Sequence, residues 1–201
     1  MQFEENCISL LVDSYNKVTN KSAFKELTEN NITAQLIGLI KSNPLRTDLN
    51  ISINREAYND TDATYTGIAE ADESPRIDMK YTVWNSNVEF EYFIEAKNVA
   101  ENNWKKSTVT TPVNAKELQK RYISTGIQNF ITGRYPHGCL VGYVTEGIPG
   151  NIVANINTLL TTESRVKENL TQRHGGFVQH YISSHTGSSI NELNHFFLEF
   201  T

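Results

Sequence analysis

The chain has 201 residues, a length that fits one domain spanning residues 1–201. Its formal net charge is −5, with 18 lysines and arginines against 23 aspartates and glutamates, so it lacks a generally basic surface for binding nucleic acids. Its two cysteines, Cys7 and Cys139, are too few for a disulfide framework and form no CxxC motif, which favours a reducing, cytoplasmic setting. The N-terminus lacks the pattern of a signal peptide and no apolar stretch approaches the length of a membrane span, so we expect no membrane association.

The first part of the chain predicts two amphipathic helices and a strand. Apolar residues recur at intervals of three and four between residues 3 and 18 and again from Ile32 to Ile40, where the second helix ends near Asn43-Pro44. Alternating apolar residues predict a strand over residues 48–58. The connector that follows, residues 59–74, is rich in acidic side chains, and we expect a flexible, solvated loop.

The stretch from Arg76 to Val99 predicts one β-hairpin. Apolar and polar residues alternate in both halves, which places Asp78, Glu95 and Lys97 on the polar face, pointing away from the core. A two-residue turn at the tip would set Asp78 opposite Glu95. Two facing carboxylates repel each other unless a cation lies between them, so this register predicts a divalent ion. A register slipped by two residues would leave Glu95 diagonal to Asp78 and within reach of the same ion.

The rest of the chain predicts alternating helices and strands, an order typical of mixed α/β domains. After a polar segment, the expected elements are a helix over 113–132, a buried strand over 138–144, a helix around 152–160, and strands over 177–183 and 195–200. The last of these is expected at a sheet edge.

The C-terminal quarter carries four histidines that raise the possibility of a zinc site. They are His174, His180, His185 and His195. Their spacings match neither a zinc finger nor an HExxH helix, so ordinary surface or core roles are favoured over metal binding. The chain also has no Walker lysine loop, no GxGxxG and no GxSxG, which argues against nucleotide hydrolysis and serine chemistry.

The spacing of three hairpin residues resembles the signature of the PD-(D/E)XK nuclease superfamily. Asp78 is followed by sixteen residues and then by Glu95-Ala96-Lys97, whereas the usual proline is displaced to Pro75. The resemblance covers about residues 29–144 and implies a restriction endonuclease-like αβββαβ core, with a mixed central sheet flanked by helices.

The resemblance also implies roles for individual residues. Asp78, Glu95 and the Ala96 carbonyl would bind Mg²⁺ or Mn²⁺, and Lys97 would assist the attacking water and stabilise the transition state. Glu29 would be an additional ligand from the N-terminal helix, with Glu26 as the second choice, although a glutamate near a helix start is equally explained by the helix dipole. The candidate substrate-binding residues are Gln119, Lys120 and Arg121 on the following helix, together with Lys105 and Lys106.

The function expected from this resemblance is metal-dependent hydrolysis of phosphodiester bonds. We expect a DNA endonuclease, with restriction or phage defence as a fitting setting. Because the chain is acidic, a homodimer or a larger protein partner is expected to supply much of the grip on nucleic acid. The alternative is a non-catalytic binding or assembly subunit that keeps the nuclease fold.

Overall fold

A computed structural model describes most of the chain. The described residues are 2–58, 60, 62–66, 68, 70, 74, 76–174 and 179–201. The predicted connector, residues 59–74, lies partly outside the described residues, and its described part includes one short helix, α5 (Asp62–Tyr65). No helix in these ranges combines the length and the apolar character needed to cross a membrane.

The described chain clusters into two compact units. The first unit comprises Met1–Lys17 and Thr33–Ile94, and the second comprises Val18–Ile32 and Glu95–Thr201. Strand β3 (Val88–Ala100) and helix α3 (Glu29–Lys41) each contribute residues to both units.

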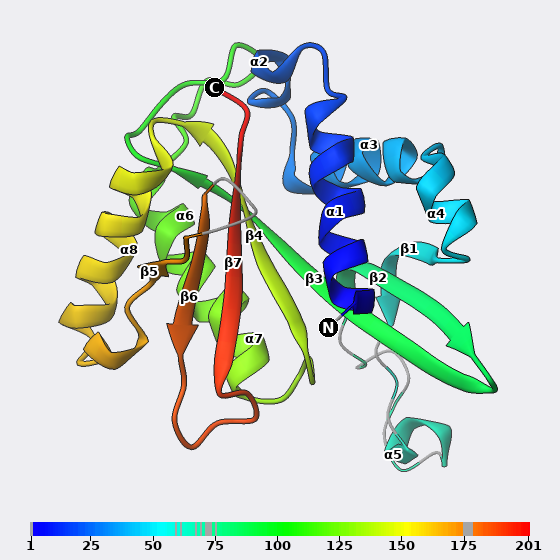
Figure 1. Ribbon diagram of the computed structural model, residues 1–201. Helices are drawn as coiled ribbons and strands as arrows, with labels where there is room; N and C mark the ends of the chain where they lie inside the picture. The colour runs from blue at the N-terminus through cyan, green and yellow to red at the C-terminus, as the bar shows by residue number, and fades with distance from the viewer. Residues whose placement is uncertain are drawn as a thin grey trace. The chain divides into compact units, whose positions relative to one another are not determined.

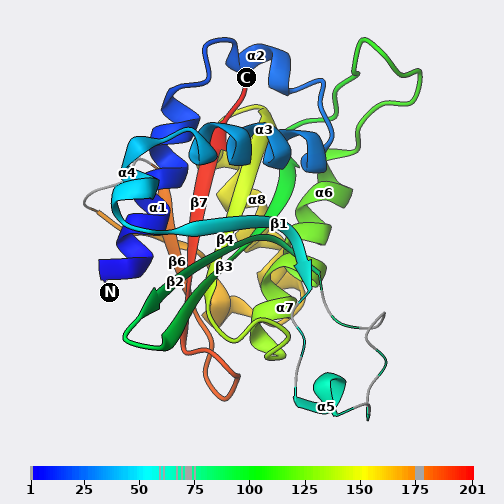
Figure 2. The same cartoon turned by 90° about the vertical axis from the view of Figure 1, so that its right-hand side faces the viewer.

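The first unit consists of helices and a three-stranded antiparallel meander (Figure 2). Its elements are α1 (Gln2–Asn16), most of α3, α4 (Pro44–Asp48), β1 (Ser52–Tyr58), β2 (Arg76–Asn85) and the first part of β3. The strand predicted over residues 48–58 begins later than expected, because Pro44 occupies the first turn of an extra helix whose N-cap is the Asn43 side chain.

The β2–β3 hairpin has the predicted register at its tip. Val83 pairs with Phe90, and the turn residues Ser86 and Asn87 both have positive φ angles of 49° and 70°, as a type I′ turn requires. From the tip, the antiparallel pairing of β2 with β3 runs from Asn85 and Val88 to Met79 and Ile94.

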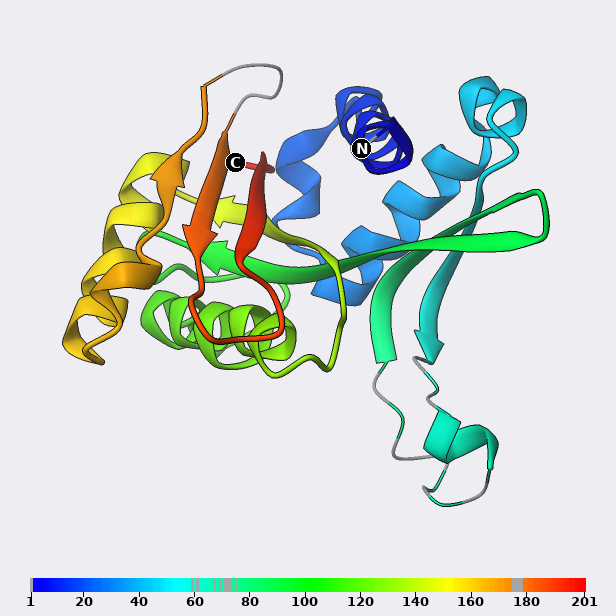
Figure 3. The same cartoon turned by 60° about the horizontal axis from the view of Figure 1, so that its bottom comes forward.

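The second unit carries strands covered by a long helical run. Its elements are α2 (Lys21–Phe24), the start of α3, the end of β3, α6 (Ala115–Arg121), a π-helix (Tyr122–Ile127), α7 (Gln128–Ile131), β4 (Gly138–Glu146), α8 (Pro149–Thr162), a 3₁₀ turn (Val166–Glu168), β5 (Thr171–Gln172), β6 (His180–Ser184) and β7 (Glu192–Glu199). Figure 3 shows α6, the π-helix and α7 as one continuous run along one side of β4, β6 and β7.

The strands are hydrogen-bonded in the order β1-β2-β3-β4-β7-β6-β5 (Figure 1). The sheet is mixed, because β4 and β7 are parallel whereas β6 and β7 are antiparallel. This confirms the predicted α/β class. The prediction that the last strand lies at an edge is wrong: β7 lies between β4 and β6. Its run of buried residues, Phe196–Leu198, fits a strand with neighbours on both sides.

Strand β3 differs from the prediction in the burial of its second half. All residues from Tyr92 to Lys97 are buried, and Glu95 and Lys97 are only 5% and 6% exposed. The prediction that these two charged side chains point away from the core is therefore wrong. Within the second unit the first turn of α3 approaches the face that they share, so that face is covered rather than solvated.

Candidate active site

The end of β3 places two charged side chains and a carbonyl at one buried point. The Lys97 ammonium donates to Glu95 Oε1 and, at 2.9 Å, to the Ala96 carbonyl oxygen. Because residues two apart on a strand share a face, Glu95 and Lys97 can form this pair without leaving strand geometry. A buried charge is stable only when it is paired, and each of these two charges provides the other's partner.

Glu29 joins this pair from the first turn of α3. Its Oε1 atom lies 3.5 Å from Lys97 Nζ, and its Oε2 atom accepts a hydrogen bond of 2.8 Å from the backbone N–H of Asn98. The Glu29 side chain is 18% exposed, so the second carboxylate lies nearer to solvent than Glu95. We call the group formed by Glu29, Glu95, Ala96 and Lys97 the charged cluster.

Three oxygen atoms of the charged cluster converge on the Lys97 ammonium. They are Glu95 Oε1, Glu29 Oε1 and the Ala96 carbonyl oxygen. Carboxylate and carbonyl oxygens are also the ligands that hard divalent cations prefer. Among the described residues, no three His, Cys, Asp or Glu side chains gather as a metal-binding group. Mg²⁺ usually keeps several of its waters and is bound in proteins through one or two carboxylates.

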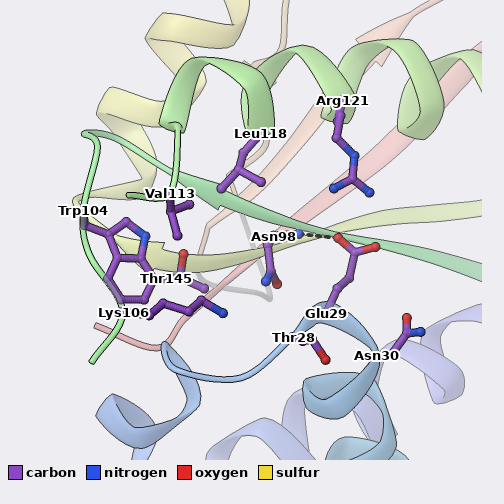
Figure 4. Close-up of a pocket in the computed structure, with 10 residues that line it drawn as sticks. All are labelled: Thr28, Glu29, Asn30, Asn98, Trp104, Lys106, Val113, Leu118, Arg121 and Thr145. Carbon is purple, nitrogen blue, oxygen red and sulfur yellow. Dashed lines mark hydrogen bonds between the residues drawn. The ribbon is translucent and has the colours of Figure 1, made fainter. Parts of the chain in front are cut away.

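A cavity of about 470 Å³ opens beside Glu29. Its lining residues are Thr28, Glu29, Asn30, Asn98, Trp104, Lys106, Val113, Leu118, Arg121 and Thr145. Figure 4 shows the Glu29 carboxylate and the Arg121 side chain toward one end, and the Trp104 ring with Val113 toward the other. Glu29 belongs both to the charged cluster and to the cavity wall, so the cavity borders the cluster at this residue.

The loop between β3 and α6 builds one end of the cavity. Trp104 and Val113 form an antiparallel bridge, with the Val113 N–H donating to the Trp104 carbonyl at 2.7 Å. Lys106 Nζ donates to the Leu27 carbonyl at 2.6 Å and lies 5.8 Å from the centre of the Trp104 ring. Burial lowers the pKa of Lys106, and the nearby Glu26 carboxylate partly opposes this shift.

Glu26, the alternative to Glu29, has a different role. Its Oε2 atom accepts hydrogen bonds from the backbone N–H of Ser107 at 2.8 Å and from the Ser107 hydroxyl at 3.0 Å. Glu26 therefore anchors the loop that carries Trp104, whereas Glu29 contacts Lys97.

The other sequence-predicted site residues are distributed around this region. Asp78 belongs to the first unit, whereas the charged cluster lies in the second. Gln119 is buried and donates to the Ala100 carbonyl at 2.8 Å, which ties α6 to the end of β3. Lys120 is exposed and pairs with Glu117, and Lys105 is also exposed. Of the three candidates on α6, Arg121 is the one that lines the cavity.

A buried polar network in the second unit was not anticipated from the sequence. The Ser183 hydroxyl lies 2.7 Å from both His185 Nε2 and His195 Nε2, and His195 Nδ1 lies 2.9 Å from the Tyr122 hydroxyl. His185 Nδ1 in turn approaches Glu168 Oε2 at 2.9 Å. The crowding of histidines was the only signal in the sequence, because the network joins residues up to 73 positions apart.

Burial sets the protonation of this network. The pKa of His195 is well below its usual value, first because the ring is buried and then because His185 and His180 lie nearby. Burial likewise lowers the pKa of His185, although Glu168 opposes this, and it raises the pKa of Tyr122 well above its usual value. The His185 and His195 rings thus favour the neutral form. This network therefore fits ordinary core roles for these histidines better than a charged site.

Comparisons with known proteins do not place the chain in a family: no family model matches the sequence, and neither the curated proteins nor the solved structures contain a significant match.

Proposed function

We propose that the chain is a metal-dependent nuclease of the restriction endonuclease-like type, acting on phosphodiester bonds and in the first place on DNA. The observation that carries the proposal is the charged cluster, in which two carboxylates from distant parts of the chain and one carbonyl oxygen surround a buried lysine ammonium. Three members of the cluster, Glu95, Ala96 and Lys97, are also the residues whose spacing resembles the nuclease signature.

The chemistry of the donors fits a hard divalent cation. Glu95, the Ala96 carbonyl and Glu29, all in the second unit, would hold the ion. A bound Mg²⁺ or Mn²⁺ would supply Lewis-acid activation of water and neutralisation of phosphate charge.

The chain's own residues supply the remaining functions. Lys97 carries a positive charge with three N–H donors, which suits stabilisation of the extra negative charge that develops on a phosphate during hydrolysis. Burial of Lys97 strengthens this effect, since charges interact more strongly away from bulk water. Arg121 presents a guanidinium at the cavity, and its planar fork suits phosphate oxygens. Glu29 holds the backbone N–H of Asn98 and so fixes the end of β3.

The proposal is tested by cleavage of plasmid and single-stranded DNA in Mg²⁺, Mn²⁺ or excess chelator. Cleavage should require the metal and should be lost in Glu95→Gln and Lys97→Met. Lys41→Met, which alters an exposed lysine at the end of α3, is the matched control and should cut like the parent chain. Undiminished cleavage by Lys97→Met, or by metal-free protein, would reject the proposal. Metal binding without cleavage of any polynucleotide would favour the non-catalytic alternative.

A further inference from the structure

The cavity beside the charged cluster has two chemically different ends. At one end the Trp104 indole and Val113 form an aromatic and apolar wall, with Lys106 Nζ 5.8 Å from the centre of the indole ring. At the other end lie Arg121 and Glu29, next to Lys97. An unpaired nucleotide has the same division, with an apolar, aromatic base on one side and a charged phosphate on the other.

The size and the polar groups of the cavity also suit a nucleotide. A volume of about 470 Å³ falls at the small end of the range typical of small-molecule sites. The Asn98 side chain lies between the two ends (Figure 4), and its Oδ1 atom is buried and accepts no hydrogen bond from the described protein. Buried polar atoms are normally satisfied, and the amide of Asn98 can donate to or accept from the edge of a base.

A paired base does not fit the same arrangement. In a duplex both faces of a base are stacked and its pairing edge is occupied, so neither the indole wall nor the Asn98 amide could be used without unpairing. The loop that carries Trp104 is held in place by its bridge to Val113 and by the Lys106 and Ser107 hydrogen bonds to residues 26 and 27. The aromatic end is thus preformed in the chain alone.

We infer that this cavity binds one unpaired nucleotide, with its base against Trp104 and its phosphate toward Arg121 and the charged cluster. The inference rests on the proposed nuclease function and narrows its substrate to single-stranded polynucleotides, overhangs or bases turned out of a duplex. Deoxyribonucleotides and ribonucleotides both carry the base and the phosphate that the cavity would recognise, so the inference covers both.

The first test measures binding without relying on cleavage. Labelled short oligodeoxyuridylate, oligouridylate and a blunt duplex of two complementary strands are titrated with protein in Ca²⁺ and followed by anisotropy. The parent chain should bind at least one single strand more tightly than the duplex. Trp104→Ala should weaken single-strand binding about tenfold, the loss expected when one stacked base loses its aromatic partner. Trp84→Ala is the matched control, since Trp84 is 60% exposed at the hairpin and lies outside the cavity.

The second test reports on the cavity directly. The chain has two tryptophans, so Trp84→Phe leaves Trp104 as the single reporter, and its emission should change on single-strand binding. Trp104→Phe should retain most of the affinity and Trp104→Leu should lose it, which separates aromatic contact from loss of volume. Arg121→Gln should make the slope of the logarithm of the binding constant against the logarithm of the salt concentration shallower by about one, the change expected when one phosphate contact is lost.

Failure of this inference is distinguishable from failure of the nuclease proposal. If no metal supports cleavage but single strands bind in a Trp104-dependent way, the nucleotide site stands alone. If cleavage is intact and Trp104→Ala and Trp104→Leu bind and cut single strands like the parent, the nucleotide site is overturned. Equal binding of duplex and single strand by the parent would overturn it as well. Preference for oligodeoxyuridylate or oligouridylate, which share the same base, decides which sugar the site accepts.

Discussion

The Lys97 ammonium neutralises the buried carboxylates, but it also occupies the point where their oxygens converge. This is the point that a bound metal ion would need. The ammonium contacts Glu95 Oε1 and the Ala96 carbonyl, with Glu29 Oε1 at 3.5 Å. A cation entering the cluster would compete with the ammonium for these oxygens.

This competition predicts the behaviour of Lys97→Met. The substitution should lower the free energy of unfolding in chelator by about 3–5 kcal/mol, because it leaves Glu95 buried without its partner. Ca²⁺ should raise the melting temperature of Lys97→Met more than that of the parent chain, since the ion then replaces the missing charge. Thermal melts with chelator and with Ca²⁺ measure both effects, with Lys41→Met as the control. An equal Ca²⁺ shift in both chains would mean that the ion and the ammonium do not share a site.

The buried histidines predict a pH dependence of stability. His195 binds a proton in the unfolded chain below about pH 6.5, but burial lowers its pKa in the folded chain. The contribution of His195 to the stability of the folded chain is therefore fully present above about pH 6.5. It is lost as the pH falls from there toward the lower pKa that His195 has in the folded chain. Neighbouring groups also affect these pKa values. Glu168 raises and Arg165 lowers the pKa of His185, and the nearby His185 and His180 lower the pKa of His195.

Urea unfolding measures this dependence. Between about pH 7.5 and 5.5 the parent chain should lose stability, because His195 takes up a proton in the unfolded chain while burial disfavours that proton in the folded chain. His195→Gln should be less stable at neutral pH, because it disrupts the contacts to Ser183 and Tyr122, but its stability should change less with pH. His137→Gln, at an exposed position, should keep the parent slope. If the stability of His195→Gln changed with pH as steeply as that of the parent chain, His195 would not be the source of the pH dependence.

At the scale of elements, the pairing of β4 with β7 leaves no room for a side chain at Gly142. Gly142 pairs with Phe197, and a Cβ atom at this glycine would lie 2.6 Å from Phe197 Cδ1 and 3.3 Å from Val99 Cγ2. The neighbouring strands on both sides thus approach the backbone of β4 closely. The positions of Val99 and the charged cluster on β3 depend on this packing.

Gly142→Ala should therefore destabilise the chain by about 1–3 kcal/mol, the usual cost of overpacking a core. Gly38→Ala is the matched control: Gly38 lies within α3 with no atom within 4 Å of an added Cβ, so alanine should stabilise by roughly 0.5–1 kcal/mol. Chemical denaturation of both variants checks the prediction. A neutral Gly142→Ala would contradict the close approach of β4 and β7.

At the scale of the whole molecule, the charge balance limits how strongly the chain can hold duplex DNA. The chain has 23 acidic residues against 18 basic ones. Two lysines near the proposed site are already engaged, with Lys106 bonded to backbone carbonyls and Lys120 paired with Glu117. Few phosphates can be neutralised by such a surface.

We therefore expect the isolated monomer to bind duplex DNA only in the micromolar range or more weakly near physiological salt. A second copy of the chain or a larger protein partner would supply the missing contacts. Anisotropy titrations combined with sedimentation analysis test this by relating affinity to the oligomeric state. Nanomolar duplex binding by a demonstrated monomer would contradict it.

The amino-acid sequence by itself determined the local features of this protein. Hydrophobic periodicity predicted α1, α3, the helical run from α6 to α7, β4 and the β2–β3 hairpin, because a period of two or of 3.6 depends only on neighbouring residues. The turn at Ser86 and Asn87 then set the register at the hairpin tip. The spacing of Glu95, Ala96 and Lys97 also placed their chemistry on one strand.

The tertiary structure decided which of these local features meet and which faces are covered. Alternation marked the face of Glu95 and Lys97 as polar, but only the approach of Glu29, more than sixty residues away in the chain, buries it. The network of Ser183, His195 and Tyr122 and the central place of β7 are likewise long-range. Periodicity cannot predict such contacts, because they depend on how distant elements pack and not on the order of residues within any one of them.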